Sequence, residues 1–269
     1  MTRQDALGPV ARALHLLRAV AEADQPLSAT ELASAVGLPT STAHRLLQLL
    51  REHAMVDLHP VDRRYRPGIE YYRLGALVVA KQPVAETARP LMTALVDEVN
   101  ESCLLGLHLP ESRKMMFAAQ VESTHALRFA IPMQVPLELV WGCSGRVIVA
   151  YLGEHEIAAT LQHADPSPVL GIAPPKRKAF EADLAAIRAR GWDFTRGEKI
   201  PHSVGLASPI FTARGVIGSL SLTIPTVRFE EERRDALAAL LTEQTSRLSS
   251  ALGAAGSSAG ASIDMPDCP

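Results

Sequence analysis

Apolar residues near the start of the chain recur every three or four positions. Val10, Leu14, Leu17 and Ala21 would therefore share one face of a helix over residues 10–22. An Asp-Gln-Pro sequence follows, and it is typical of the end of a helix. The same periodicity returns twice within the next thirty residues. The N-terminal part of the chain thus predicts three short helices.

The second predicted helix has clear start and stop signals. Ser28, with Glu31 three positions later, has the pattern of a capping box, in which both side chains satisfy backbone N–H groups at a helix start. Gly37 follows, where a residue without Cβ adopts the left-handed conformation at little cost. Only Leu38 and Pro39 then precede the third helix. Two short helices joined by a tight glycine turn are typical of a helix-turn-helix.

The third predicted helix, residues 40–53, has one apolar face and one polar face. The polar face and the helix start carry hydrogen-bonding side chains, namely Thr40, Ser41, Thr42, His44, Arg45 and Gln48. Side chains of this kind bond base edges and phosphates in the major groove of DNA. A polar helix face is in general simply solvated, but the capped helix and glycine turn before it favour DNA recognition.

A β-hairpin is predicted directly after this helix. Residues 55–58 alternate like a strand, residues 60–63 favour a turn, and a returning strand begins at Arg64. Such a wing would present Arg63, Arg64 and Arg66 to phosphates or to the minor groove, and of these we expect Arg63 and Arg64 to contact DNA. Residues 1–70 hold eight Arg and eight Asp or Glu. Affinity for DNA must therefore come from the placement of charges and from two copies of the domain.

Beyond residue 83 the pattern changes to strand-like runs between helices. Strands are predicted over residues 102–109, 114–121, 125–132, 192–194, 204–210 and 216–224. Helices are predicted over residues 84–100, from near Cys143, and over residues 174–190 with Gly191 at the end. The second half is therefore expected to be α+β.

Composition narrows the class of protein. The 269 residues include 27 Lys and Arg against 29 Asp and Glu, which gives a net charge of −2. This excludes a protein that binds nucleic acid through a large overall positive charge, as histones do. No apolar run approaches the roughly 20 residues that span a bilayer, and no secretory signal is present, so we expect a cytoplasmic protein without a membrane partner. Three widely spaced cysteines indicate free thiols. No motif indicates a metal or a cofactor.

The helix-turn-helix segment resembles a known family. The run GLPTSTAHRLLQLLREHAMV, followed by DRRYRPGIEYYRLGALV, is similar to the IclR family of bacterial transcriptional regulators, whose members read close to LPxSTxHRLLxxL with a YxLG element in the linker. The likeness is specific over residues 10–80 and looser up to about residue 252. It implies a winged helix-turn-helix domain over residues 1–68, a linker helix over 69–83 and a GAF-like effector-binding domain over 84–252. Independently of the resemblance, the Gly-, Ala- and Ser-rich composition predicts a disordered tail over 253–269.

The resemblance also implies where an effector binds. The family's HATALGK segment corresponds to residues 140–146, and backbone N–H groups at Cys143 and Ser144 would hold an effector carboxylate. Val140 and Trp141 replace the family's His-Ala, which makes the expected pocket wall more aromatic. Trp141 would then stack on the effector.

Further departures from the family pattern concern the size of the effector. The family's effector-contacting cysteine corresponds to Gly205, and its acidic pocket residue corresponds to Thr195, next to Arg196. Ser221 and Thr223 fall where family members offer hydroxyl groups. The lost cysteine and acid leave room for an aromatic or branched carboxylate, whose charge Arg196 or the helix-start amides would hold.

The same residues also have structural interpretations. Trp141 is equally interpretable as a core residue, and Cys143 as a small buried hydrophobe. Ser221 and Thr223 lie two positions apart, so they share one face of a strand, and that face is alternatively a solvated one.

We expect a ligand-responsive DNA-binding regulator, as a homodimer or a dimer of dimers on double-stranded operator DNA, with a small-molecule carboxylate effector. One alternative is a regulator that responds to a protein partner. The other is a hydrolase, but the sequence from Gly142 to Gly145 is one residue short of the G-x-S-x-G motif and no positioned base is evident. The sequence therefore predicts no enzyme.

Overall fold

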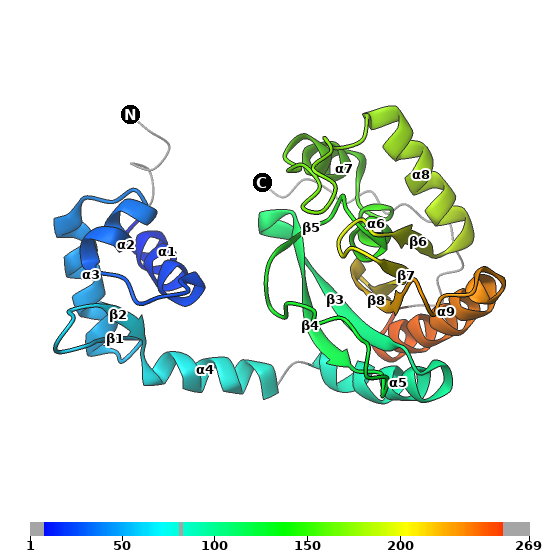
Figure 1. Cartoon of the computed structure of the whole chain (residues 1–269). Coiled ribbons are helices and arrows are strands. Elements are labelled where there is room, and N and C mark those ends of the chain that lie inside the picture. Colours follow the sequence, from blue (N-terminus) through cyan, green and yellow to red (C-terminus); the bar gives the residue numbers. More distant parts are fainter. Residues whose placement is uncertain (1–7, 81–82, 255–269) are drawn as a thin grey trace. The chain divides into compact units, whose positions relative to one another are not determined.

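The structure is a computed structural model that describes residues 8–80 and 83–254 of the chain (Figure 1). The chain divides between Gln82 and Pro83 into two compact units. Apart from its first two residues, the expected disordered tail lies outside the described residues, as does the end of the expected linker at residues 81–82. No described helix is long and apolar enough to cross a membrane.

The first unit contains four helices and a two-stranded sheet within the described residues. Its elements are α1 (Pro9–Glu22), α2 (Ala29–Ala35), α3 (Thr40–Glu52), β1 (Val56–Leu58), β2 (Tyr65–Pro67) and α4 (Ile69–Ala80). The predicted capping box is confirmed, because Ser28 N–H donates to Glu31 Oε2 at 2.7 Å and Glu31 N–H donates to Ser28 Oγ at 3.3 Å. Gly37 has a φ of 66°, as the predicted turn requires. The predicted helix-turn-helix and wing are therefore present.

The start of α4 is hydrogen-bonded to the backbone that follows α3. Gly68 N–H donates to Met55 O at 2.9 Å, and Glu70 N–H donates to Ala54 O at 3.1 Å. A Cβ at position 68 would lie 2.1 Å from Ala54 O, so only glycine fits there. Leu16, Leu32 and Leu47 are fully buried in the core of this unit.

The second unit is built on one antiparallel sheet of six strands in the order β5-β4-β3-β8-β7-β6. Its strands are β3 (Ser102–Leu109), β4 (Lys114–Val121), β5 (Leu137–Glu138), β6 (Asp193–Arg196), β7 (Ser203–Thr212) and β8 (Gly215–Pro225). Its α-helices are α5 (Pro83–Val99), α6 (Cys143–Val149), α7 (Glu154–Gln162), α8 (Arg177–Arg190) and α9 (Arg234–Ala251). Together with the first unit, this confirms the predicted α+β class.

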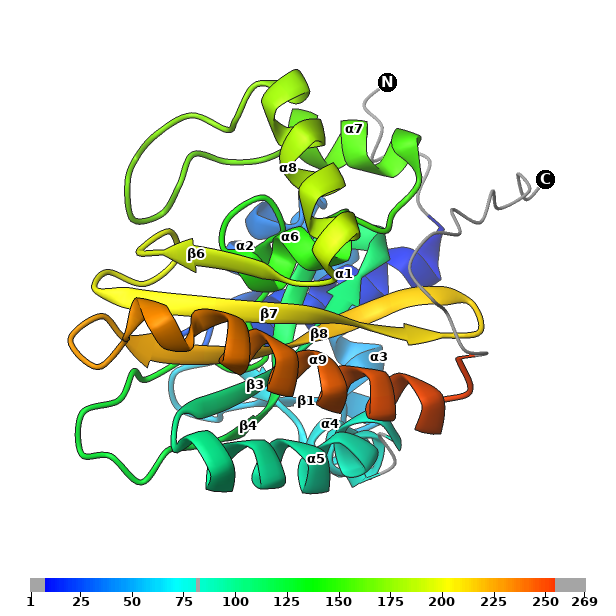
Figure 2. The same cartoon turned by 90° about the vertical axis from the view of Figure 1, so that its right-hand side faces the viewer.

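Two layers of helices cover the two faces of this sheet. Helices α5 and α9 lie on one face, and α6 and α8 on the other (Figure 2). Because side chains alternate along a strand, Leu220 and Leu222 of β8 join the core beneath α5 and α9. Ser219 and Ser221 face α6 instead, and Ser219 Oγ donates to Ser144 O at 3.0 Å. We call this second surface the α6 face of the sheet.

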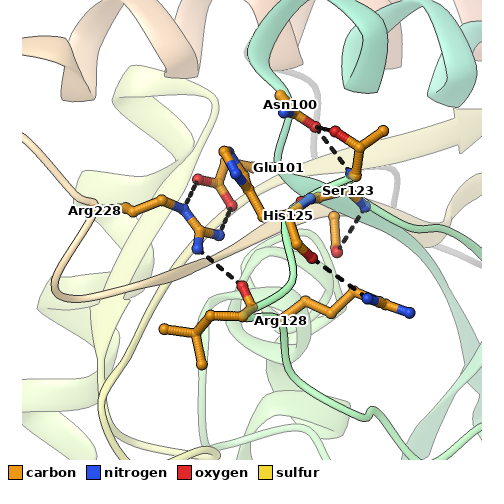
Figure 3. Close-up of polar contacts among 9 residues, drawn as sticks. Asn100, Glu101, Ser123, His125, Arg128 and Arg228 are labelled. Carbon is orange, nitrogen blue, oxygen red and sulfur yellow. Dashed lines mark hydrogen bonds and ion pairs between the residues drawn. The ribbon is translucent and has the colours of Figure 1, made fainter.

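The prediction of a strand over residues 125–132 is wrong, because this segment is an irregular connection between β4 and β5. Side chains satisfy its carbonyl groups in place of a neighbouring strand (Figure 3). Arg228 forms two hydrogen bonds with the carboxylate of Glu101, at 2.7 and 2.8 Å, and donates a third to Leu127 O at 2.8 Å. Arg128 donates to His125 O at 3.3 Å. The apolar pattern of this segment could not indicate that Arg228, a hundred residues later, bonds to it.

Candidate DNA-binding and effector-binding sites

The polar face of α3 is open to solvent. Thr40, Ser41, His44, Arg45 and Gln48 are exposed, and Thr42 is half-buried. Within the described part of the chain, none of these six side chains forms an ion pair or a hydrogen bond. The opposite face of α3 is buried in the core of the first unit. The structure therefore brings the predicted DNA-contacting residues of α3 together on one free surface.

The two wing arginines have different surroundings. Arg63 is exposed at the tip of the hairpin, with a φ of 55°. Arg64 is used within the unit, because Nη1 donates to Pro26 O at 2.7 Å and to Glu31 Oε2 at 3.1 Å. A phosphate contact by Arg63 or Arg64 stays a prediction. For Arg64, the structure adds a role that the sequence did not indicate, which is to hold the wing against α2.

At the start of α6, two backbone N–H groups are already bonded within the chain. Gly142 N–H donates to Glu198 Oε2 at 2.9 Å, and Cys143 N–H donates to Thr195 Oγ1 at 3.1 Å. Arg146 of α6 lies 3.1 Å from the buried carboxylate of Asp193 and 3.6 Å from that of Glu198. Sequence reasoning missed Glu198, since a residue in a turn between two strands gives no periodic signal.

Four of the predicted effector residues come together here. Cys143 of α6 is buried against Thr195 and Gly205 of the sheet, and Ser144 is buried next to Cys143 at the start of the helix. A Cβ at position 205 would lie 2.7 Å from Cys143 Sγ and 3.5 Å from Thr195 Oγ1. Cys143 thus brings a thiol beside position 205, where the family resemblance expects a cysteine side chain.

The thiol of Cys143 is chemically unreactive in this setting. Burial, with the negative charge of Asp193 as a second cause, raises the pKa of Cys143 to about 12. The neutral thiol therefore predominates at physiological pH, and a neutral buried thiol is a poor nucleophile. This supports the interpretation of Cys143 as a small buried hydrophobe.

Ser221 and Thr223 share the α6 face of the sheet. Register places Ser221 opposite Ala207 and Thr223 opposite Gly205. Ser221 is 2% exposed, and its hydroxyl oxygen has no hydrogen-bond partner within the described residues. Buried polar groups are nearly always paired, so an unpaired hydroxyl at this position requires an explanation.

The structure does not bring Trp141 and Arg196 to this surface as free groups. Trp141 is 6% exposed within the core beside α6, and its indole N–H donates to Asp165 O at 2.9 Å. Its stacking on an effector stays a prediction. Arg196 pairs with Glu231 and lies over the Phe194 ring. Because neighbours along a strand point to opposite faces, Arg196 lies on the other side of the sheet from Thr195.

These two units together define a class of protein. A winged helix-turn-helix with a free polar recognition helix, joined in one chain to an α+β unit, is the organisation of a DNA-binding transcriptional regulator with an effector-binding domain. The family described as IclR helix-turn-helix domain matches residues 9–59, and that described as bacterial transcriptional regulator IclR C-terminal matches residues 76–250. The chain belongs to the IclR family of bacterial transcriptional regulators.

Known transcriptional regulators are similar to this chain along most of their length. The transcriptional repressor IclR of Escherichia coli is 26% identical over 250 residues, which cover 90% of this chain and 89% of the repressor. The regulator TtgV of Pseudomonas putida is 27% identical over 225 residues, or 83% of each chain. These relatives are regulators of transcription and not enzymes.

Solved structures share the fold. A putative IclR regulator from a Silicibacter species has a TM-score of 0.82 with 24% identity, and the match covers 92% of this chain and 97% of that one. An IclR homologue from Microbacterium hydrocarbonoxydans, complexed with 4-hydroxybenzoate, has a TM-score of 0.73 with 20% identity over 91% of this chain and 99% of that one.

Proposed function

We propose that this regulator binds operator DNA through α3 and the wing, and that its second unit binds a small organic acid that changes this binding. The observation that carries the proposal is the free polar face of α3. Ser41, His44 and Arg45 have no partner within the described chain, although such side chains bond readily to base edges and phosphates. We propose that it acts in the cytoplasm, where bacterial operator DNA lies.

The proposed effector site is the α6 face of the sheet near Cys143. The unpaired hydroxyl of Ser221 supports it, since a buried polar atom without a partner is satisfied when a ligand supplies one. An aromatic acid is the class we favour, because a structural relative of the same family is complexed with 4-hydroxybenzoate. A response to a protein partner would leave this buried hydroxyl unexplained.

We further propose that two copies of the chain pair through the first unit. Large apolar side chains are exposed on α4, where Ile69 is 76% and Tyr72 is 64% exposed. On α1, Val10 and Leu14 are likewise exposed. Surface of this kind is typical of an interface between subunits. Pairing would set the spacing of two recognition helices on a palindromic operator.

The effector must then favour one arrangement of the paired domains over another. A ligand shifts such an equilibrium only by its difference in affinity for the two states. Regulation therefore requires that the acid bind more tightly to the DNA-bound form or to the free form, and the sign decides whether the acid recruits or releases the protein.

A DNA-binding experiment tests the proposal. Selection from a random DNA pool gives the preferred sequence, and gel-shift titration then compares the wild type with Arg45→Ala. If Arg45 bonds a base, the variant loses about 1 to 3 kcal/mol of binding free energy. Arg214→Ala is the matched control, since Arg214 is an exposed arginine of the second unit, in the turn between β7 and β8. Equal affinity of Arg45→Ala and wild type would remove Arg45 from the interface.

A further inference from the structure

Two polar side chains, a buried one at Ser221 and a partly buried one at Gln120, flank Leu104 on the α6 face of the sheet. Register places Leu104 opposite Gln120 of β4 on one side and opposite Ser221 of β8 on the other. Leu104 packs in the core beside α6, so the side chains of all three residues lie on this face of the sheet. With strands about 4.8 Å apart, Gln120 and Ser221 stand about 10 Å from each other.

Both polar groups lack a partner. The amide nitrogen of Gln120 and the hydroxyl oxygen of Ser221 are buried, and neither has a hydrogen bond within the described residues. One unpaired buried group is uncommon, and two in one row across the same face are a stronger sign of a missing partner. A molecule bound between them would supply acceptors to both.

A lysine extends over the same face of the sheet. Lys199, in the turn between β6 and β7, runs alongside Gly142, where a Cβ would lie 3.0 Å from Lys199 Cδ. Its ammonium nitrogen lies 3.5 Å from Met115 Sδ. The methyl group of Met115 in turn covers Gly106, two residues along β3 from Leu104.

No carboxylate in the described part of the chain lies within 4.0 Å of the Lys199 ammonium. The acidic groups around it have other partners. Glu198 accepts from Gly142 N–H and lies near Arg146, and Glu138 pairs with Lys114 at 3.1 Å. A thioether is a weak acceptor, so the ammonium is left without a counter-ion.

We propose that Lys199 binds the acid group of the effector, while Ser221 and Gln120 each bind a different oxygen atom elsewhere on the same molecule. This inference rests on the proposed function, in which this unit binds an organic acid. It assigns the effector to the hydroxy or oxo acids. The N–H groups of Gly142 and Cys143 do not hold the acid, because Glu198 and Thr195 occupy them.

The charge of Lys199 gives the site a pH dependence. Burial lowers the pKa of Lys199 to about 8, while Glu138 from β5 and the adjacent Glu198 oppose this shift. The thiol of Cys143, whose own pKa burial raises to about 12, also faces Lys199. The ammonium therefore predominates at pH 7 and is largely lost by pH 9, so binding of an acid weakens about tenfold between these values.

Calorimetric titration of the full chain tests the assignment with benzoate, 4-hydroxybenzoate, lactate and pyruvate, and with the corresponding neutral amides. We expect wild type to prefer acids to amides, and Lys199→Met to lose at least tenfold in affinity for acids. Lys178→Met is the matched control, since Lys178 is an exposed lysine of α8. Ser221→Ala should abolish the preference of the protein for the hydroxylated acid over benzoate.

The outcomes separate this inference from the proposed function. Equal binding of acids by wild type and Lys199→Met overturns the role of Lys199 alone. Binding of none of the acids by wild type overturns both the inference and the sensing part of the proposed function, while DNA binding by α3 is tested independently.

Urea unfolding of the protein without ligand tests whether Lys199 merely stabilises the fold. An uncompensated ammonium opposes folding, so Lys199→Met should raise the urea midpoint at pH 7. Because the unfolded state binds the proton more tightly, wild type gains stability from pH 7 to 9 and the difference between the two proteins narrows. A lower midpoint for Lys199→Met at pH 7 would overturn the proposal.

Discussion

Gly205→Ala is expected to destabilise the second unit through one steric contact. The new Cβ would lie 2.7 Å from Cys143 Sγ, which is closer than two such atoms approach in proteins. Cys143 cannot move away easily, because it is 4% exposed and its N–H is bonded to Thr195. Overpacking costs about 1 to 3 kcal/mol. Alanine also lowers the conformational entropy of the unfolded chain, which stabilises the folded state by about 0.4 to 1 kcal/mol. The net loss is therefore about 1 to 2 kcal/mol.

Urea unfolding followed by tryptophan fluorescence measures this loss, since both tryptophans of the chain, Trp141 and Trp192, lie in the second unit. The double variant Gly205→Ala with Cys143→Ala removes the opposing thiol and should recover at least about 1 kcal/mol relative to the sum of the single variants. A double variant whose loss equals that sum would refute the steric explanation. So would a Gly205→Ala protein as stable as wild type.

Three further results are expected. Arg228→Met should lower the free energy of unfolding by about 3 kcal/mol in urea, because it leaves the buried carboxylate of Glu101 unpaired, and a loss below about 1 kcal/mol would contradict this. Cys103 and Cys143 should resist iodoacetamide at pH 8 in the folded chain, since burial raises the pKa of each thiol to about 12, and both should react in urea. Light scattering should show that Tyr72→Glu yields monomers; a variant that still pairs would place the interface elsewhere.

The N-terminal unit was predictable because its signals are local. Ser28 and Glu31 lie within one helical turn, and the glycine turn at Gly37 needs only its own backbone conformation. The strands over residues 102–109 and 114–121 were equally predictable, because a buried or alternating apolar run is itself the signal.

The arrangement of the proposed effector site was less predictable, because it depends on contacts between distant segments. Nothing near Gln120 in the sequence indicates that it lies in one row with Ser221, a hundred residues later, since only strand register determines this. Arg196 was assigned to the effector from its position next to Thr195, but alternation along β6 directs it away. The family resemblance indicated a region around Cys143 for the effector, which stays a prediction, and it did not indicate the contacts that the individual residues make.

The attachment of α4 has a mechanical consequence for signalling. Gly68 and Glu70 fasten its first turn to the backbone at Ala54 and Met55, and Arg64 clamps the hairpin to α2. Among the described residues, these hydrogen bonds leave no free joint between α4 and the helix-turn-helix, whose polar face we propose to bind DNA. A rotation of α4 about its axis would therefore turn the helix-turn-helix and the wing with it as one rigid body. A residue larger than glycine at position 68 would clash with Ala54 O and loosen this attachment.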